Sequence, residues 1–277
     1  MIPSDYIAEW RAHAPWAADS QVEQDLILSR AVVAMYSESE VARRLAFRGA
    51  TALYKLHLRP AARYSEDIDL VQINAGPIGG VLNAIRSTLD PWLGLPRRAT
   101  KEDSIVLIYR MRSESQPSVP MRLKVEINSR EHFSVFGVEE HEFAVQSRWF
   151  NGSTKVKTYQ LDELLGTKLR ALYQRKKGRD LFDLFIANSM ANVSPVRLVE
   201  CFARYLEHDG KRITRAELEM NLQGKLSDAT FLSDVTPLIA PDVNWRIEDA
   251  AEYVWREILP LLPGEPWKGG EQPTREA

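Results

Sequence analysis

The spacing of apolar residues predicts helices toward both ends of the chain. Within residues 4–45, Val22, Leu26 and Val33 recur at helical spacing, which places them on one face of a helix. A leucine stripe at the same spacing begins at Leu161, and the pattern returns in later segments. Those segments are SPVRLVECFARYLEHD, TRAELEMNLQGKL and IEDAAEYVWREILPLLP. The chain is therefore expected to end in a helical region.

The middle of the chain is predicted to form a sheet. Apolar and polar residues alternate in SEDIDLV and in MRLKVEIN, as in strands with one buried face. SESQPSVP is expected to join SIVLIYRMR to MRLKVEIN as a hairpin connection. The short apolar run LAFR ends at Gly49, where a helical pattern begins.

Composition excludes several classes of protein. With 44% hydrophobic and 27% charged residues among 277, the chain has the make-up of a folded globular protein. A net charge of −2 gives no chain-wide attraction to nucleic acid, and the single cysteine, Cys201, excludes an intrachain disulfide. No apolar run is long enough for a membrane span, and the first residues lack a signal-peptide core. A cytoplasmic protein with no membrane partner is expected.

Two aspartates in SEDIDLV indicate a metal site. Asp67 and Asp69 alternate with Ile68 and Leu70, so both carboxylates point to one face of the strand. Same-face positions lie roughly 6.5 to 7 Å apart at Cα, where two ionised carboxylates repel unless a positive charge lies between them. Mg²⁺, which shares carboxylates with substrate phosphates, meets that need. A solvated acidic turn would show the same pattern.

The glycine turn before this strand offers an anion site. Unpaired backbone N–H groups at the helix start and the Thr51 hydroxyl would hold phosphate, and Gly49 lets the backbone approach closely. Glu126, in MRLKVEIN, is a third strand carboxylate. It would converge with the two aspartates if the strands are neighbours, and otherwise it faces solvent. His132 and His141 have no metal-ligand partner at zinc spacing and are interpreted as surface residues.

Basic residues gather between Arg148 and Asp180. Nine Lys or Arg face three acids in this segment, a local excess of six positive charges. Such a run either binds the phosphate backbone of a nucleic acid or forms an ordinary solvated face. Within it, Gly178 is expected to interrupt the helix.

Four motifs, taken in order, resemble the AbiEii/AbiGii family of nucleotidyltransferase toxins. They are FRGATALYK, RYSEDIDL, LKVEIN and KLRALYQRKKGRDLFDL, and together they cover residues 45–187. The family is a branch of the polymerase-β-like superfamily that includes the mycobacterial MenT toxins. The resemblance implies an α+β fold, with a small mixed sheet flanked by helices in a nucleotidyltransferase core over residues 1–158. A helical C-terminal domain would follow over residues 159–277.

The resemblance also assigns roles to individual residues. The nucleotide would be bound by Gly49, Ala50, Thr51, Ser65, Lys168, Arg175 and Arg179. The metal would be held by Asp67, Asp69 and Glu126, and the residues expected to serve catalysis are Asp67, Asp69, Glu126, Lys168, Asp180 and Asp183. Ala50 departs from the second glycine or serine usual after the first glycine, which leaves the phosphate grip and nucleotide choice open.

The activity implied is transfer of NMP from an NTP, with Mg²⁺ or Mn²⁺ as cofactor, by a toxin that a separately encoded antitoxin neutralises. In MenT-like members the acceptor is the 3′ end of tRNA, so an RNA acceptor is expected. Two alternatives share the same residues. One is transfer to a protein or small molecule, and the other is a nucleotide-binding regulator in which Ala50 reflects lost catalysis.

Overall fold

The computed structural model describes residues 2–114 and 117–269. The chain divides into two compact units. The first is Met1–Gln160 with Leu238–Asp242, and the second is Leu161–Pro237 with Val243–Ala277. The sequence predicts a single domain boundary after residue 158. In the structure the chain also returns to the first unit for the short segment Leu238–Asp242. There Ala240 donates its backbone N–H to Ala62 and Tyr64 donates to Leu238.

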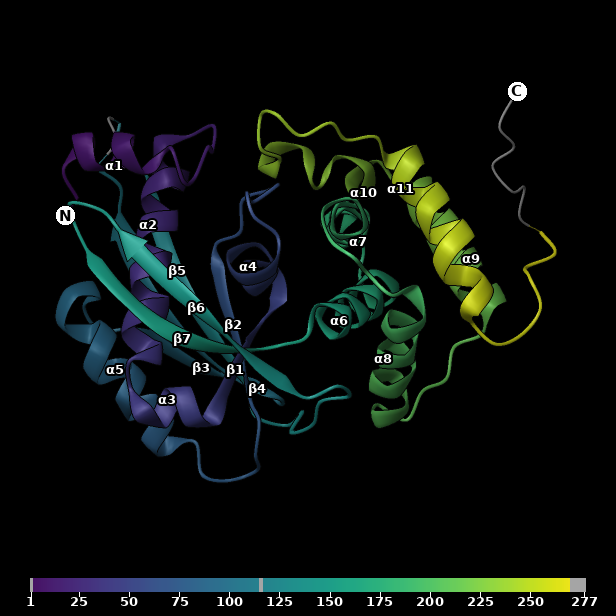
Figure 1. Cartoon of the computed structure of the whole chain (residues 1–277), viewed down its shortest axis with the longest axis horizontal. Helices are drawn as coiled ribbons and strands as arrows, with labels where there is room; N and C mark the ends of the chain where they lie inside the picture. The colour runs from purple at the N-terminus through teal and green to yellow at the C-terminus, as the bar shows by residue number, and fades with distance from the viewer. Residues whose placement is uncertain (1, 115–116, 270–277) are drawn as a thin grey trace. The chain divides into compact units, whose positions relative to one another are not determined.

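A seven-stranded sheet forms the centre of the first unit, in the order β3-β4-β5-β2-β1-β7-β6 (Figure 1). The β2–β5 and β1–β7 pairs are parallel and the other pairs are antiparallel, so the sheet is mixed. The strands are β1 Leu45–Arg48, β2 Asp67–Gln72, β3 Arg97–Thr100, β4 Ser104–Arg112, β5 Pro120–Asn128, β6 Val138–Gln146 and β7 Asn151–Tyr159. The expected strand pair on either side of SESQPSVP is confirmed as β4 and β5.

Helices cover both faces of this sheet. They are α1 Ser4–Trp10, α2 Asp19–Tyr36, α3 Ser39–Arg44, α4 Gly49–Ala52 continuing as the π-helix η1 Leu53–His57, and α5 Gly79–Leu93. Helix α2 packs against β2, β5, β6 and β7 and buries Leu26, Ile27 and Val33. Figure 1 shows α2 and α5 on one side of the sheet and α4 on the other. The apolar strand face therefore meets α2, and the face with the acids meets α4.

The described residues of the second unit are helical. Its elements are α6 Leu161–Gln174, α7 Gly178–Met190, α8 Pro195–His208, α9 Arg215–Leu226, α10 Ala229–Ser233, η2 Thr236–Leu238, α11 Ile247–Tyr253, η3 Val254–Ile258 and η4 Leu259–Leu261. The leucine stripe of α6 is buried at Leu164, Leu165, Leu169 and Leu172 as its spacing predicted, whereas Leu161, the first residue of the helix, is half-buried. Gly178 begins α7, and a Cβ there would lie 2.2 Å from the Phe231 carbonyl oxygen, so only glycine fits.

The α+β fold expected from the sequence is confirmed: a mixed sheet with flanking helices precedes a helical region. In the part of the chain that the structure describes, no helix has both the length and the apolar character to cross a bilayer.

Candidate active site

The glycine turn brings the start of α4 against the acid pair. Gly49 has φ +77°, and a Cβ at this position would lie 2.4 Å from Oδ2 of Asp69. Only glycine tolerates both the left-handed backbone and the close carboxylate. Arg48, which is opposite Asp69 in the β1–β2 register, forms an ion pair with Glu131. The Asp69 side chain therefore lies at the glycine turn, as the acid-pair interpretation requires.

The two hydroxyl residues assigned to phosphate binding meet behind this turn. Thr51 Oγ1 lies 2.8 Å from Ser65 Oγ and donates to the Asp67 carbonyl oxygen at 2.5 Å. Ala50 and Thr51 are buried, with 9% and 2% of their surfaces exposed. The Thr51 hydroxyl therefore ties α4 to the start of β2, and its one proton is already donated within the fold.

The three strand carboxylates share one face of the sheet. In the parallel β2–β5 register, Asp69 is opposite Glu126 and Asp67 is opposite Lys124. Ile68 is fully buried on the other face, whereas the carboxylates are half-buried. Strands β2 and β5 are therefore neighbours, and the three carboxylates lie on one face, although they are not among the groups of described residues whose ligand atoms all lie within 4.8 Å.

Lys124 is the residue of this cluster that the sequence interpretation missed. Its Nζ lies 3.0 Å from Asp67 Oδ2 and 2.9 Å from Glu126 Oε2. The strand alternation that singled out Glu126 also puts Lys124 on the same face. However, its contact with Asp67 depends on the pairing of two strands 57 residues apart in sequence.

Ion pairs control the charge of Glu126. Although burial raises the pKa of a carboxyl, hydrogen bonds from Lys101, Lys124 and Ser104 bring the pKa of Glu126 down to about 2. The Lys101 and Ser104 contacts to Oε1 are both 2.8 Å. Burial lowers the pKa of Lys124, but Asp67 and Glu126 more than offset it, so that pKa is raised. Glu126 is thus ionised and held by two lysines.

The donor set on β2 fits a divalent cation. Asp67 Oδ1 is buried and has no hydrogen-bond partner, an arrangement that a cation would relieve. Glu126 differs because its carboxylate is already engaged. A second group of possible metal ligands lies elsewhere in the first unit. It consists of His57, Glu139 and His141, and among the described residues it is the one group of three whose ligand atoms all lie within 4.8 Å of one another.

In the second unit, two buried aspartates bind Lys168 and Arg175, two of the residues assigned to nucleotide contact. Lys168 Nζ lies 2.9 Å from Asp183 Oδ2 and 3.4 Å from Asp180 Oδ1. Arg175 binds Asp180 with two nitrogens, at 2.7 and 2.8 Å. Both aspartates are fully buried. They hold Lys168 and Arg175 in place, whereas Arg179 pairs with Asp234 instead.

The basic segment is not a continuous cationic surface. Its members fall in both units, and most pair with acids from outside the segment, which sequence counting could not include. Arg148 contacts Asp5 and Glu9, while Lys176 contacts Asp228. The further pairs are Lys155–Glu142, Arg170–Asp209, Lys177–Asp234 and Arg179–Asp234. The expected local excess of charge is therefore largely offset.

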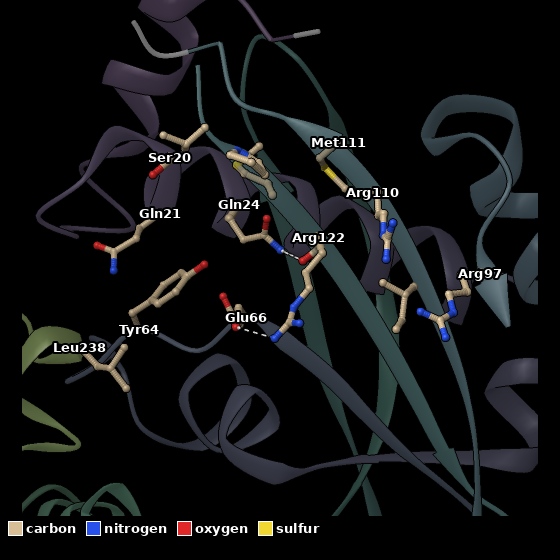
Figure 2. Close-up of a pocket in the computed structure, with 14 residues that line it drawn as sticks. Ser20, Gln21, Gln24, Tyr64, Glu66, Arg97, Arg110, Met111, Arg122 and Leu238 are labelled. Atoms are coloured by element: carbon tan, nitrogen blue, oxygen red, sulfur yellow. Dashed lines mark hydrogen bonds and ion pairs between the residues drawn. The ribbon is translucent and has the colours of Figure 1, made fainter. Parts of the chain in front are cut away.

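A cavity of about 740 Å³ is lined by residues of α2, β3, β4 and β5 (Figure 2). Arg97, Arg110 and Arg122 line it from β3, β4 and β5, and Glu66 lines it from just before β2. Arg110 and Arg122 are opposite each other in the β4–β5 register. Figure 2 shows the Arg122 guanidinium directed at Glu66, and their closest atoms are 3.9 Å apart. The cavity is thus lined by more positive than negative groups.

Comparisons with known proteins give the family of the chain and relatives of its fold. The model of the family described as "Nucleotidyl transferase AbiEii toxin, Type IV TA system" matches residues 30–253. MenT4, a nucleotidyltransferase toxin from Mycobacterium tuberculosis H37Rv, is similar in structure with a TM-score of 0.61 and 17% identity, over 90% of this chain and 87% of that one. JHP933 from Helicobacter pylori aligns with a TM-score of 0.47 and 18% identity, over 84% and 88%. No curated protein matches the sequence.

Proposed function

The chain belongs to the AbiEii family of nucleotidyltransferase toxins of type IV toxin–antitoxin systems, and from this premise we propose that it transfers NMP from an NTP to RNA. The enzyme class follows from the family, and so does an antitoxin partner. The acceptor proposed is the 3′ end of tRNA, and the cofactor is Mg²⁺, with Mn²⁺ as its substitute. Because NTPs and tRNA are cytoplasmic, the reaction is placed in the cytoplasm.

The observation that carries this proposal is the joint position of Gly49, Asp67 and Asp69. A carboxylate lies against the left-handed glycine at a helix start, and a second carboxylate on the same strand face has a buried oxygen without a partner. Helix starts bind phosphate, and paired carboxylates bind the cation that accompanies it. The combination suits a nucleoside triphosphate.

Asp67 and Asp69 are the residues proposed to hold the metal. When bound, a divalent cation offsets the charge that develops on the transferred phosphoryl group and on pyrophosphate. Glu126 has a different role in this proposal. A carboxylate with a pKa of about 2 is a weak base, so Glu126 is better suited to fix Lys124 beside Asp67 than to accept the proton of the attacking hydroxyl.

The remaining residues bind the nucleotide and the acceptor. The backbone N–H groups at Gly49 and Ala50 receive the triphosphate, and Thr51 and Ser65 keep the turn in place through their shared hydrogen bond. In the second unit, the resemblance implies a nucleotide-contact role for Lys168, Arg175 and Arg179, and Asp180 and Asp183 are proposed to position Lys168.

The arginines of the cavity are proposed to bind the phosphate backbone of the acceptor. Arg122 is two positions from Lys124 on β5, so it shares the strand face of the acid cluster. Like charges directly opposite on neighbouring strands destabilise a sheet, and an anionic ligand across Arg110 and Arg122 relieves that repulsion. This surface replaces the basic segment as the proposed acceptor site.

The test is to incubate the purified chain with each labelled NTP, Mg²⁺ and total tRNA. Label on tRNA together with release of pyrophosphate is the expected result. Label on protein or on a small molecule would support the alternative acceptors, and nucleotide binding without pyrophosphate release would support a regulator.

Asp67→Asn and Asp69→Asn should each lower the transfer rate by at least about 100-fold, the order of effect of losing one electrostatic group at a reaction centre. Exposed Asp103→Asn provides the matched control and should keep full activity. Circular dichroism checks that the variants fold. Full activity in either strand variant would remove the acid pair from the site.

A further inference from the structure

Three potential metal ligands meet where η1 approaches β6. His57 ends η1, and Glu139 and His141 alternate along β6, so the latter two side chains share a strand face. One ligand atom from each residue lies within 4.8 Å of the others. His141 Nε2 is 2.7 Å from Glu139 Oε1, and His57 Nδ1 is 3.9 Å from the same oxygen. The two imidazole rings are 4.6 Å apart between centroids.

His57 carries the second observation. Its side chain is 6% exposed, and its Nε2 is buried with no hydrogen-bond partner. An unsatisfied buried polar atom costs stability, so such atoms are rare unless a ligand completes them. The ligand must therefore bind Nε2 of His57, because a metal on Nδ1 would leave the buried Nε2 without a partner.

The donor set selects the class of metal. Two imidazoles with one carboxylate are typical of Zn²⁺, whereas Mg²⁺ prefers oxygen donors alone. Glu139 and His141 are 40% and 29% exposed, so the site is open to solvent and a water can occupy the fourth position. This chemistry differs from that of the oxygen-only pair Asp67 and Asp69.

We propose that His57, Glu139 and His141 bind one Zn²⁺ ion, separate from the acid pair of β2. Zn²⁺ binding replaces the hydrogen bond between His141 Nε2 and Glu139. The neutral His141 ring then carries its proton on Nδ1, so that the lone pair of Nε2 coordinates the ion. The ion then links edge strand β6 to η1, which continues the helix that starts at the glycine turn. The site is therefore a metal crosslink within the first unit.

The experiment uses the full chain carrying Asp67→Asn and Asp69→Asn, which removes the acid pair as a competing site. Zn²⁺ is titrated by calorimetry, and Co²⁺ replaces it as a spectroscopic probe of nitrogen ligation. One ion per chain is expected. Glu139→Gln and His141→Gln, added to this background, should each weaken Zn²⁺ affinity at least tenfold.

The two glutamine substitutions are chosen because both positions are partly exposed and glutamine retains hydrogen-bonding groups, so the variants should fold. His208→Ala, at an exposed histidine of the second unit, is the matched control and should bind Zn²⁺ as the background does. Saturating Zn²⁺ should raise Tm in the background and not in His141→Gln. An unchanged affinity in both glutamine variants, or no Zn²⁺ uptake by the background, would overturn the proposal.

Discussion

At the scale of single residues, local conformation and burial decide what each side chain can do. Gly49 has a positive φ, and a Cβ at this position would overlap the carboxylate of Asp69. Glu23 is a carboxyl placed inside the protein, where Oε2 accepts a hydrogen bond from the Glu114 N–H. Both positions yield predictions that need no knowledge of the substrate.

Gly49→Ala should destabilise the fold by about 1–3 kcal/mol, the cost of holding a non-glycine residue in the left-handed region, and should lower transfer activity by displacing Asp69. Gly94→Ala is the matched control, because Gly94 has φ +78° and no atom within 4 Å of an added Cβ. Denaturant titration of both variants separates two contributions to the loss of stability: the cost of a positive φ, which both variants share, and the cost of overlap with Asp69, which only Gly49→Ala has. Equal effects on stability and activity would show that the Asp69 contact is unimportant.

Glu23→Gln should stabilise the protein at high pH. Burial raises the pKa of Glu23 to about 7, so the folded state binds this proton more tightly than the unfolded state does. Its contribution to stability is then present below the unfolded pKa near 4.5 and is lost as pH rises toward 7.

Thermal unfolding of Glu23→Gln and the parent should therefore agree at pH 4, diverge as pH rises from about 4.5 to about 7, and differ by a constant amount above pH 7. The variant should be more stable there by about 1–2 kcal/mol, less than the full pKa shift implies once solvent screening is allowed for. Exposed Glu142→Gln should show no such divergence. A difference that does not vary with pH would contradict the raised pKa.

At the scale of elements, side chains from neighbouring helices and strands complete one another. Lys225 of α9 donates from Nζ to the carbonyl oxygens of Leu172 and Tyr173, in the last turn of α6. Lys168 of α6 reaches Asp180 and Asp183 of α7 in the same way. Without these contacts, helix packing would bury the carbonyl oxygens and the carboxylates without a hydrogen-bond or charge partner.

Lys168→Met should destabilise the second unit by about 3–5 kcal/mol, because it leaves two fully buried aspartates with one charge partner fewer. Lys176→Met, which removes an exposed partner of Asp228, should cost less than about 1 kcal/mol. Denaturant unfolding followed by circular dichroism compares the two variants. A Lys168 variant as stable as the Lys176 variant would show that the network does not support the helix pair.

At the scale of the whole molecule, charge is arranged locally. A net charge of −2 provides no general attraction to RNA, and the basic segment is offset by acids brought in by folding. Arg97, Arg110 and Arg122 line one cavity, and Arg122 lies on the same face of β5 as Lys124 and Glu126. Acceptor binding should therefore depend on salt through these arginines.

The double variant Arg110→Gln with Arg122→Gln should weaken tRNA binding, and most strongly at low salt. Losing two phosphate contacts should reduce the slope of log K against log salt by roughly 1.4 to 1.8. Fluorescence anisotropy across a salt series measures this slope. Arg256→Gln, an exposed position in the second unit, is the control, and an unchanged slope in the double variant would place the acceptor elsewhere.

Sequence periodicity by itself determined several of the elements and the features that lie within one of them. The shared face of Asp67 and Asp69, the helix start at Gly49 and the buried stripe of α6 all follow from side chains a few positions apart. Such patterns are local because the geometry of a strand or helix fixes which neighbours share a face. The α+β fold was predictable for the same reason, with help from the family resemblance.

Tertiary structure alone decided which residues meet across elements. The insertion of Lys124 between Asp67 and Glu126, the acids that offset the basic segment, and the meeting of His57 with Glu139 and His141 join positions far apart in sequence. His141 has its carboxylate neighbour on its own strand, but its histidine partner comes from η1. Charge and ligand contacts act through space, so strand order and register had to be known before these partners could be identified.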